Sequence, residues 1–344
     1  MLKSYLATVA GGKNLSREQA REAMHVIMSG QSTDSQIGAF LTALRMKGEI
    51  SAEVAGFAET MRNQATPVRC RQEELIDTCG TGGDGRNTFN ISTTVALVVA
   101  GAGLAVAKHG NRGVSSSSGS ADVLEALGVN LELTPEAVAD AIGDIGVGFL
   151  YAPQFHSAMK YAAKPRRELG FRTVFNLLGP LSNPASACYQ LVGVYEESLT
   201  EKVAEALLEL GVKGAMVVHS LDGLDEISTA APTAVSEVRD GKVHSYRLDP
   251  AALGFVSPGT DGYKGGTPAD NAAITRDILQ GVTGPKRDIV LINAAAALLV
   301  GEKAANLEEG IELARRSLDS GAALAKLEAL KEFSQLRREG LSLS

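Results

Sequence analysis

Apolar residues recur every third or fourth position over the first part of the chain, which is the spacing of an amphipathic helix. Ser16 with Gln19 and Thr33 with Gln36 each fit a capping box, in which the two side chains satisfy free N–H groups of a first helical turn. No strand pattern precedes residue 75. Three helices are therefore expected around the apolar runs of residues 20–28, 37–44 and 54–61.

The apolar pattern changes after Pro67, whose ring disfavours helix in the residue before it. Short apolar runs then alternate with helical stretches, which predicts an α/β sheet with helices on its faces. Asp240-Gly241 predicts a hairpin, and Thr134 followed by Pro135 predicts a helix start. The glycine and prolines of residues 179–184 predict a turn that connects domains. Strands are expected at residues 75–78, 104–107, 189–194 and 215–219, and buried alanine-rich helices at residues 293–300 and 321–330.

The composition is that of a soluble cytoplasmic enzyme, with 44% hydrophobic and 21% charged residues. A formal net charge of −7 argues against a nucleic-acid-binding protein, which usually carries a basic field. Cys70, Cys79 and Cys188 form neither a disulfide framework nor a zinc pattern. The apolar runs of residues 93–107 and 289–301 are too short to span a bilayer, and the first residues lack the apolar core of a signal peptide. We therefore expect no nucleic acid and no membrane among the partners.

Glycines, hydroxyls and amides crowd residues 77–93, just before a helix expected to begin near Ser92. Glycines let backbone N–H groups approach an anion, and the free N–H groups of a helix start add a favourable partial charge, so this stretch predicts a phosphate cradle. Gly80, Gly82 and Gly85 match the dinucleotide pattern G-x-G-x-x-G. That pattern needs an acidic residue about 20 positions later, whereas the next expected strand here runs into Lys108. A P-loop is excluded as well, because no lysine follows the glycines at the required position.

A second polar stretch, residues 108–120, combines lysine, histidine, asparagine and arginine with five serines. Because it lies between an expected strand and an expected helix, where open α/β sheets bind ligands, we interpret it as a binding loop rather than a flexible linker. Asp225-Glu226 follows the expected strand at residues 215–219. Magnesium takes one or two carboxylates together with phosphates and water, so this pair is a metal candidate. The alternative is a pair of solvated acids.

With these motifs in view, the chain resembles the anthranilate phosphoribosyltransferase family along essentially its whole length. The resemblance implies a small all-helical N-terminal domain and a larger α/β domain with a mostly parallel central sheet, of the nucleoside phosphorylase or phosphoribosyltransferase type. The expected domains are residues 1–67, joined by a returning segment at about 165–184, and residues 68–344. The matching motifs are GTGGD at 80–84, NIST at 90–93, KHGNRGVSSSSGSAD at 108–122, KPRRELGFRTVFNLLGPLSNP at 164–184 and DGLDEIS at 222–228.

The resemblance implies transfer of a phosphoribosyl group from 5-phosphoribosyl 1-pyrophosphate to the amine of anthranilate, a step of tryptophan biosynthesis. It assigns no residue as a strong acid or base, and gives positioning to Asn111 and Arg166. Gly80, Asn111 and Arg166 are the expected anthranilate contacts, while His109 and His156 would line the approach. The expected contacts of phosphoribosyl pyrophosphate are Gly80, Gly83, Asp84, Thr88, Asn90, Ile91, Ser92, Thr93, Lys108, His109, Gly110, Asn111, Arg112, Gly113, Val114, Ser115, Ser116 and Ser120.

The same resemblance places Mg²⁺, two ions per subunit, on Ser92, Asp225 and Glu226, and implies a cytoplasmic homodimer formed through the helical domain. Three alternatives stay open. Arg166 and Arg167 could form only the start of a surface helix, although a guanidinium also suits the anthranilate carboxylate through a planar fork. The protein could also be a pyrimidine nucleoside phosphorylase, or a nucleic-acid-binding relative without the activity. The intact motifs, with Asn111 and Arg166 among them, favour the transferase.

Overall fold

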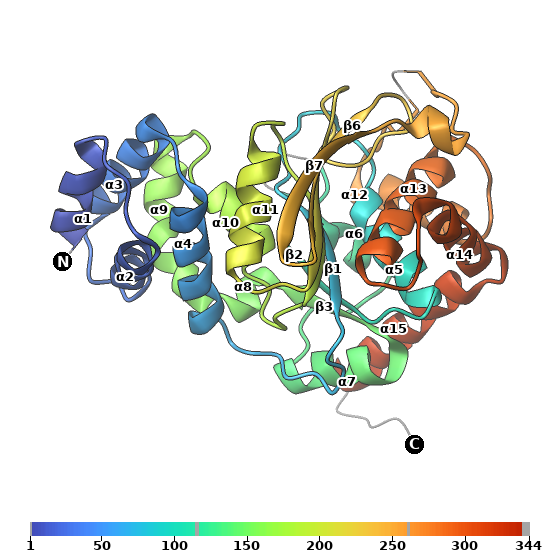
Figure 1. Ribbon diagram of the computed structural model, residues 1–344. Helices are drawn as coiled ribbons and strands as arrows, with labels where there is room; N and C mark the ends of the chain where they lie inside the picture. Colours follow the sequence, from blue (N-terminus) through green and yellow to red (C-terminus); the bar gives the residue numbers. More distant parts are fainter. Residues whose placement is uncertain (1, 114–116, 260–261, 339–344) are drawn as a thin grey trace.

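The computed structural model describes residues 2–113, 117–259 and 262–338 (Figure 1). The chain begins with four helices, and the two predicted capping boxes are confirmed at Ser16 with Gln19 and at Thr33 with Gln36. The first helix was not predicted, because it buries few apolar side chains, Leu2 and Val9. The four helices are α1 (Leu2–Ala10), α2 (Arg17–Met28), α3 (Asp34–Lys47) and α4 (Ser51–Gln64).

Two later helices, α9 (Lys160–Leu169) and α10 (Phe175–Leu181), lie beside the N-terminal helices in Figure 1 and share their apolar core. We expected a turn at residues 179–184, since glycine and proline there favour one. This prediction is wrong for the first three of these residues, which belong to α10. Burial of Leu178 and Leu181 keeps the segment helical past Gly179 and Pro180.

A sheet of seven strands fills the centre of the molecule, in the order β3-β2-β1-β4-β5-β6-β7. Neighbours from β3 to β5 pair in parallel, while β6 and β7 pair antiparallel at one edge. The predicted fold class, a helical domain with a mostly parallel α/β sheet, is confirmed. The strands are β1 (Ile76–Gly80), β2 (Val106–Gly110), β3 (Val147–Tyr151), β4 (Tyr189–Gly193), β5 (Gly214–Ser220), β6 (Thr233–Arg239) and β7 (Lys242–Leu248).

Several local predictions can be compared with the sheet. The hairpin is confirmed, because β6 and β7 meet at Asp240-Gly241, both with positive φ, as a two-residue turn requires. β3 was not predicted, since periodicity alone does not distinguish a strand from a helix in an apolar run of five residues. β2 extends to Gly110, so Lys108 lies in the strand and not in the loop after it.

Helices cover both faces of the sheet, and strand side chains alternate between two apolar cores. Leu191 and Met216 point into one core, which the helices on the right of Figure 1 cover. Val192 and Val217 point into the other, which continues through α11 into the N-terminal helices. The remaining helices are α5 (Ile91–Gly101), α6 (Ser120–Ala126), α7 (Pro135–Ile145), α8 (Ala152–Phe155), α11 (Leu199–Glu209), α12 (Pro268–Leu279), α13 (Pro285–Val300), α14 (Leu307–Asp319) and α15 (Ala322–Arg338).

Thr134 caps α7 as predicted, and α13 and α15 contain the two expected alanine-rich helices. Within the described ranges no helix combines the length and the apolar character needed to cross a bilayer. The carboxyl ends of β1, β2 and β5 carry the motifs singled out above. Because ligands bind at this edge of an open parallel sheet, the candidate site is expected there.

Candidate active site

The glycine-rich turn after β1 is held by backbone and side-chain contacts from two other segments. Thr81 donates its N–H to the Gly193 carbonyl (2.8 Å) and accepts at Oγ1 from the Tyr195 N–H (3.1 Å). The Gly82 N–H donates to Asp225 Oδ2 at 3.0 Å. Gly82 has a φ of 63°, a conformation that glycine adopts without strain. The turn is therefore a fixed structure tied to the ends of β4 and β5.

Arg172 holds the same turn from the side of the helical domain. Its guanidinium donates a hydrogen bond to the Gly83 carbonyl and lies 4.1 Å from the centre of the Tyr195 ring. Arg172 was not among the predicted site residues. Its sequence signal was its place in the long motif at residues 164–184. The returning segment thus reaches the glycine-rich turn directly.

The two acids after β5 lie partly buried beside this turn. Burial, together with the neighbouring Asp84 carboxylate, raises the pKa of Asp225, and burial with Asp225 raises the pKa of Glu226. Asp84 Oδ2 is itself a buried acceptor without a hydrogen-bond partner among the described residues. Carboxylates crowded in this way repel one another unless protons or a cation intervene. Asp225 and Glu226 therefore fit a bound divalent cation, with Asp84 close by.

The described ranges contain no cluster of three histidine, cysteine, aspartate or glutamate side chains that could hold a metal ion by themselves. Magnesium differs from zinc here, because it typically uses one or two carboxylates and completes its shell with phosphate and water oxygens. The backbone of Ser92 in the first turn of α5 donates to the Glu226 carboxylate and lowers its pKa, against the effect of burial. Ser92 and Glu226, both predicted metal ligands, are therefore neighbours.

Lys108 provides the positive charge of the site. It is buried in β2, and its Nζ donates to the Thr78 carbonyl (2.6 Å) and reaches Ser92 Oγ at 3.4 Å. Burial lowers the pKa of Lys108, while the carboxylates of Asp77 and Glu226 raise it. The sequence prediction that Lys108 belongs to the site is consistent with this position between the first turn of α5 and the acids.

Asp77 and Asn183 form a buried pair next to the site. Neither residue was among the predicted site residues. Asp77 accepts the His109 N–H (3.1 Å) and the Asn183 side-chain amide (2.8 Å), and burial raises its pKa to about 6. Asn183 also donates to the Ala107 carbonyl at 2.8 Å. The available signal was an aspartate inside an apolar parallel strand, a position where a charge is rare unless it is paired.

His109 and His156 lie in contact near this pair, with ring centres 5.1 Å apart and ring planes tilted by 55°. Burial lowers the pKa of His109 to about 3 and that of His156 to about 4. Each ring donates to a backbone carbonyl of the returning segment, at Gly179 and at Ser182, while each Nε2 is buried without a partner in the described structure. Both imidazoles are therefore neutral at physiological pH.

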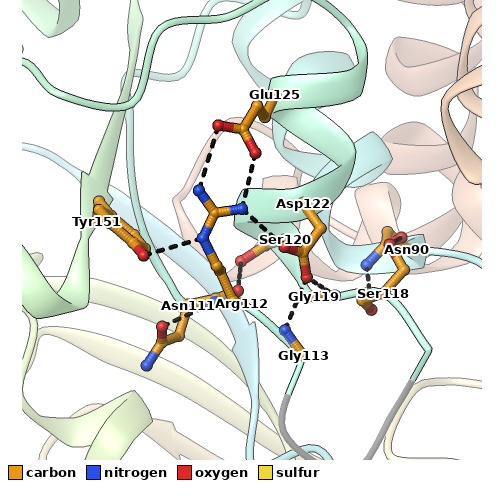
Figure 2. A network of polar contacts seen from close by, with 10 residues as sticks. All are labelled: Asn90, Asn111, Arg112, Gly113, Ser118, Gly119, Ser120, Asp122, Glu125 and Tyr151. Carbon is orange, nitrogen blue, oxygen red and sulfur yellow. Dashed lines mark hydrogen bonds and ion pairs between the residues drawn. The ribbon is translucent and has the colours of Figure 1, made fainter. Parts of the chain in front are cut away.

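Two of the predicted phosphate contacts have side chains that are already bonded within the protein. Asn90 accepts from Ser118 Oγ (3.1 Å) and from Asn271 Nδ2 (2.9 Å), and donates to the Ser118 carbonyl (3.1 Å). Arg112 bonds to Asp122, Glu125 and Tyr151, as Figure 2 shows. These side chains join the segments of the site to one another.

Arg166 stands in the opposite situation. It lies in the last turn of α9, so it does not begin a helix, and its guanidinium is 4.9 Å from the centre of the Phe175 ring. The guanidinium forms neither an ion pair nor a hydrogen bond with any residue in the described part of the chain. Burial lowers the pKa of Arg166. A largely buried cation without a carboxylate partner favours an anionic ligand.

The other predicted residues occupy varied places. Asn111 Oδ1 accepts the Arg112 N–H (2.8 Å), and Ser120 Oγ donates to the Asn111 carbonyl (3.3 Å). Thr88 forms an isolated bridge with Lys264, whereas Ile91 and Thr93 are buried in the first turn of α5. The predicted contacts Val114, Ser115 and Ser116 lie outside the described residues. Those at Gly80, Gly83, Gly110 and Gly113 are main-chain positions along the same sheet edge.

Comparison with known proteins agrees with this geometry. The model "Glycosyl transferase family, helical bundle domain" matches residues 3–65, and "Glycosyl transferase family, a/b domain" matches residues 72–324. Anthranilate phosphoribosyltransferase of Symbiobacterium thermophilum is 55% identical over 98% of this chain and 99% of its own length. The relative of the same name from Moorella thermoacetica is 55% identical, over 96% of this chain and 97% of its own.

Solved structures give the same result. Anthranilate phosphoribosyltransferase from Thermus thermophilus superposes with a TM-score of 0.92 at 44% identity, covering 96% of this chain and 99% of that one. The Saccharomyces cerevisiae protein, solved in complex with PRPP and Mg, superposes with a TM-score of 0.89 at 31% identity, covering 97% and 98%. From these matches over nearly the whole length, the chain belongs to the anthranilate phosphoribosyltransferase family of glycosyltransferase enzymes.

Proposed function

We propose that the protein transfers the phosphoribosyl group of 5-phosphoribosyl 1-pyrophosphate to the amine of anthranilate, giving N-(5-phosphoribosyl)anthranilate and pyrophosphate. The observation that carries the proposal is the partly buried pair Asp225 and Glu226, held between a glycine-rich turn and the buried Lys108. This set of charges suits a magnesium-bound diphosphate. Relatives of this name align with the chain over nearly its whole length, which supports a place in tryptophan biosynthesis.

The chain's own groups account for binding of the sugar donor. We assign the pyrophosphate to the turn at Gly80, Gly83 and Asp84 and to the first turn of α5, where free N–H groups favour an anion. Lys108 adds a buried positive charge beside Ser92. The ribose phosphate falls to the second loop. The full set of proposed donor contacts is Gly80, Gly83, Asp84, Thr88, Asn90, Ile91, Ser92, Thr93, Lys108, His109, Gly110, Asn111, Arg112, Gly113, Val114, Ser115, Ser116 and Ser120.

Mg²⁺ would be held by Asp225, Glu226 and the Ser92 hydroxyl, and we propose two ions per subunit. A bound Mg²⁺ neutralises charge that develops on the leaving pyrophosphate. The raised pKa of both acids and the unpaired Asp84 Oδ2 support a cation here. The yeast relative was solved with PRPP and Mg, in agreement with this choice of metal.

Anthranilate would be placed by Arg166, Asn111 and the bare backbone at Gly80. The Arg166 guanidinium has no other anion to pair with in the described structure, so it is available to a carboxylate. An aromatic amine is unprotonated near neutral pH, so its nitrogen can attack the anomeric carbon without a strong base. His109 and His156 are neutral and line the approach. Catalysis then consists of positioning and of stabilising the departing charge.

One fluorescence assay tests the proposal. Anthranilate fluorescence should fall when the protein, Mg²⁺ and phosphoribosyl pyrophosphate are mixed, and stay constant if any of the three is omitted. Arg166→Ala should chiefly raise the KM for anthranilate, whereas Asp225→Ala with Glu226→Ala should chiefly lower kcat. Cleavage of a pyrimidine nucleoside by phosphate, without loss of anthranilate, would point to a nucleoside phosphorylase instead.

The same proposal extends to the organisation of the chain. Residues 1–67 would form the helical domain, joined by the returning segment 165–184, and residues 68–344 would form the α/β domain with the donor site. The shared apolar core of α4 and α10 supports this division. We also propose a cytoplasmic homodimer through the helical domain, where Met46 on α3 is 84% exposed. Sedimentation should then give twice the chain mass of 35.9 kDa.

A further inference from the structure

Asp122, in the first turn of α6, accepts hydrogen bonds from two separate backbone positions of the second loop. Its Oδ2 accepts the N–H of Gly113 (2.8 Å) and the N–H of Gly119 (2.9 Å). Its Oδ1 accepts from the Arg112 guanidinium at 3.0 Å. Figure 2 shows these contacts converging on the start of the helix. One side chain therefore fixes two stretches of main chain that lie six positions apart.

Four of the five N–H donors of the Arg112 guanidinium hold this arrangement. Besides Asp122, its guanidinium bonds to Glu125 twice, at 2.7 Å and 3.2 Å, and its Nε donates to the Tyr151 hydroxyl at 3.1 Å. The two carboxylates hold the guanidinium in a planar fork, the geometry in which arginine binds acids most firmly. Arg112 in this position points its donors at the protein and not at a substrate phosphate (Figure 2).

The main chain at Gly119 leaves no room for a side chain. A Cβ on Gly119 would lie 2.3 Å from the Gly113 nitrogen and 2.4 Å from the Asn111 carbonyl oxygen. The two backbone segments therefore cross in contact, and the shared acceptor on Asp122 keeps them there. Ser118, next to Gly119, bonds in turn to Asn90 at the start of α5. These hydrogen bonds thus connect the second loop to the segment at the start of α5.

We propose that Asp122 is a positioning residue of the phosphoribosyl pyrophosphate site, and that the side chains of Arg112 and Glu125 act by bracing its carboxylate, so that Arg112 would contact the donor only through its main chain. This inference rests on the proposed function, because it assumes that the donor binds at this sheet edge. Asp122 would set the place of the Gly113 and Gly119 backbone, and with it the place of Asn111 and Ser118. It should therefore govern affinity for the sugar donor more than affinity for anthranilate.

Asp122→Asn tests the inference, since it keeps the size of the side chain and turns one acceptor into a donor. The KM for phosphoribosyl pyrophosphate should rise about ten- to hundredfold, the effect of losing one or two charge-assisted hydrogen bonds. The KM for anthranilate should change by less than about threefold. Glu125→Gln, which weakens the brace without touching the loop, should shift the donor KM in the same direction by a smaller factor.

Asp270→Asn is the matched control. Asp270 also accepts the N–H of its own helix cap, Thr267, in the first turn of α12, but it holds no second segment. It should leave both KM values unchanged. If Asp122→Asn had the donor KM of the unaltered protein, or if it raised both KM values equally and melted at a lower temperature, the inference would be wrong. If the unaltered protein consumed no anthranilate, the proposed function itself would fail, which is a separate result.

Discussion

Replacing Gly193 by alanine should disable the site, because the added methyl group would collide with the backbone of Asp225. Gly193 ends β4, between Gly80 of β1 and Val218 of β5. A Cβ built there lies 1.6 Å from the carbonyl oxygen of Asp225 and 2.6 Å from its carbonyl carbon. Real Cβ atoms essentially never approach a heavy atom within 3.0 Å, so the Asp225 backbone or the strand must move by about 1.4 Å.

Neither side can move freely. β4 is paired with a strand on each side, and its Gly193 carbonyl also accepts the Thr81 N–H. The displacement should therefore fall on the turn that carries the Asp225 and Glu226 carboxylates. Overpacking of this kind lowers the free energy of unfolding by about 1–3 kcal/mol. A misplacement of about 1 Å at a reacting centre can lower the rate by about a hundredfold.

The assay is the anthranilate fluorescence decrease, followed over a titration of Mg²⁺. Gly193→Ala should lower kcat/KM by about two orders of magnitude and shift half-maximal activity to higher Mg²⁺ concentration. Gly38→Ala is the control, because no atom lies within 4 Å of a Cβ built in that helix. It should be neutral or stabilise by up to about 1 kcal/mol. Unchanged kcat/KM and Mg²⁺ dependence in Gly193→Ala would refute the reasoning.

Two further predictions concern stability. Asn183→Ala removes buried hydrogen bonds to Asp77, Ala107 and Ala185, and should lower the free energy of unfolding in urea by about 2–4 kcal/mol; a loss below about 1 kcal/mol would contradict this role. Burial lowers the pKa of His156 to about 4 from 6.5, so between these values the unfolded chain binds the extra proton. Its contribution, at most about 3 kcal/mol, is present above pH 6.5 and lost as pH falls to about 4. His156→Phe should flatten that part of the stability profile, and an unchanged slope would show that another group is responsible.

Local structure could largely be predicted from the sequence, because the groups that determine it are close along the chain. Both capping boxes join residues three positions apart, and the Asp240-Gly241 turn needs only positive φ at its own two residues. The helix start at Thr134 has the same short range. Where burial competed with propensity, the prediction failed, as at Gly179–Leu181, which α10 keeps helical.

The same distinction between short-range and long-range contacts applies to the site. Glycines, serines and the acids at 225 and 226 could be singled out from the sequence, since phosphate and magnesium demand those residue types in short runs. The supports of the site could not, because each acts on a partner far along the chain. Arg172 holds Gly83, and Asn183 holds Asp77.

The amino-acid sequence alone therefore determined the helix caps, the hairpin, the strands β1, β2, β4 and β5, and the chemical character of the binding loops. Only the tertiary structure decided that Lys108 lies within a strand facing the acids, and that Arg112 is engaged by Asp122 and Glu125. A capping box or a two-residue turn is stabilised by atoms fixed within one turn of backbone. A buried charge takes its partner and its pKa from whichever segments the folded sheet brings beside it.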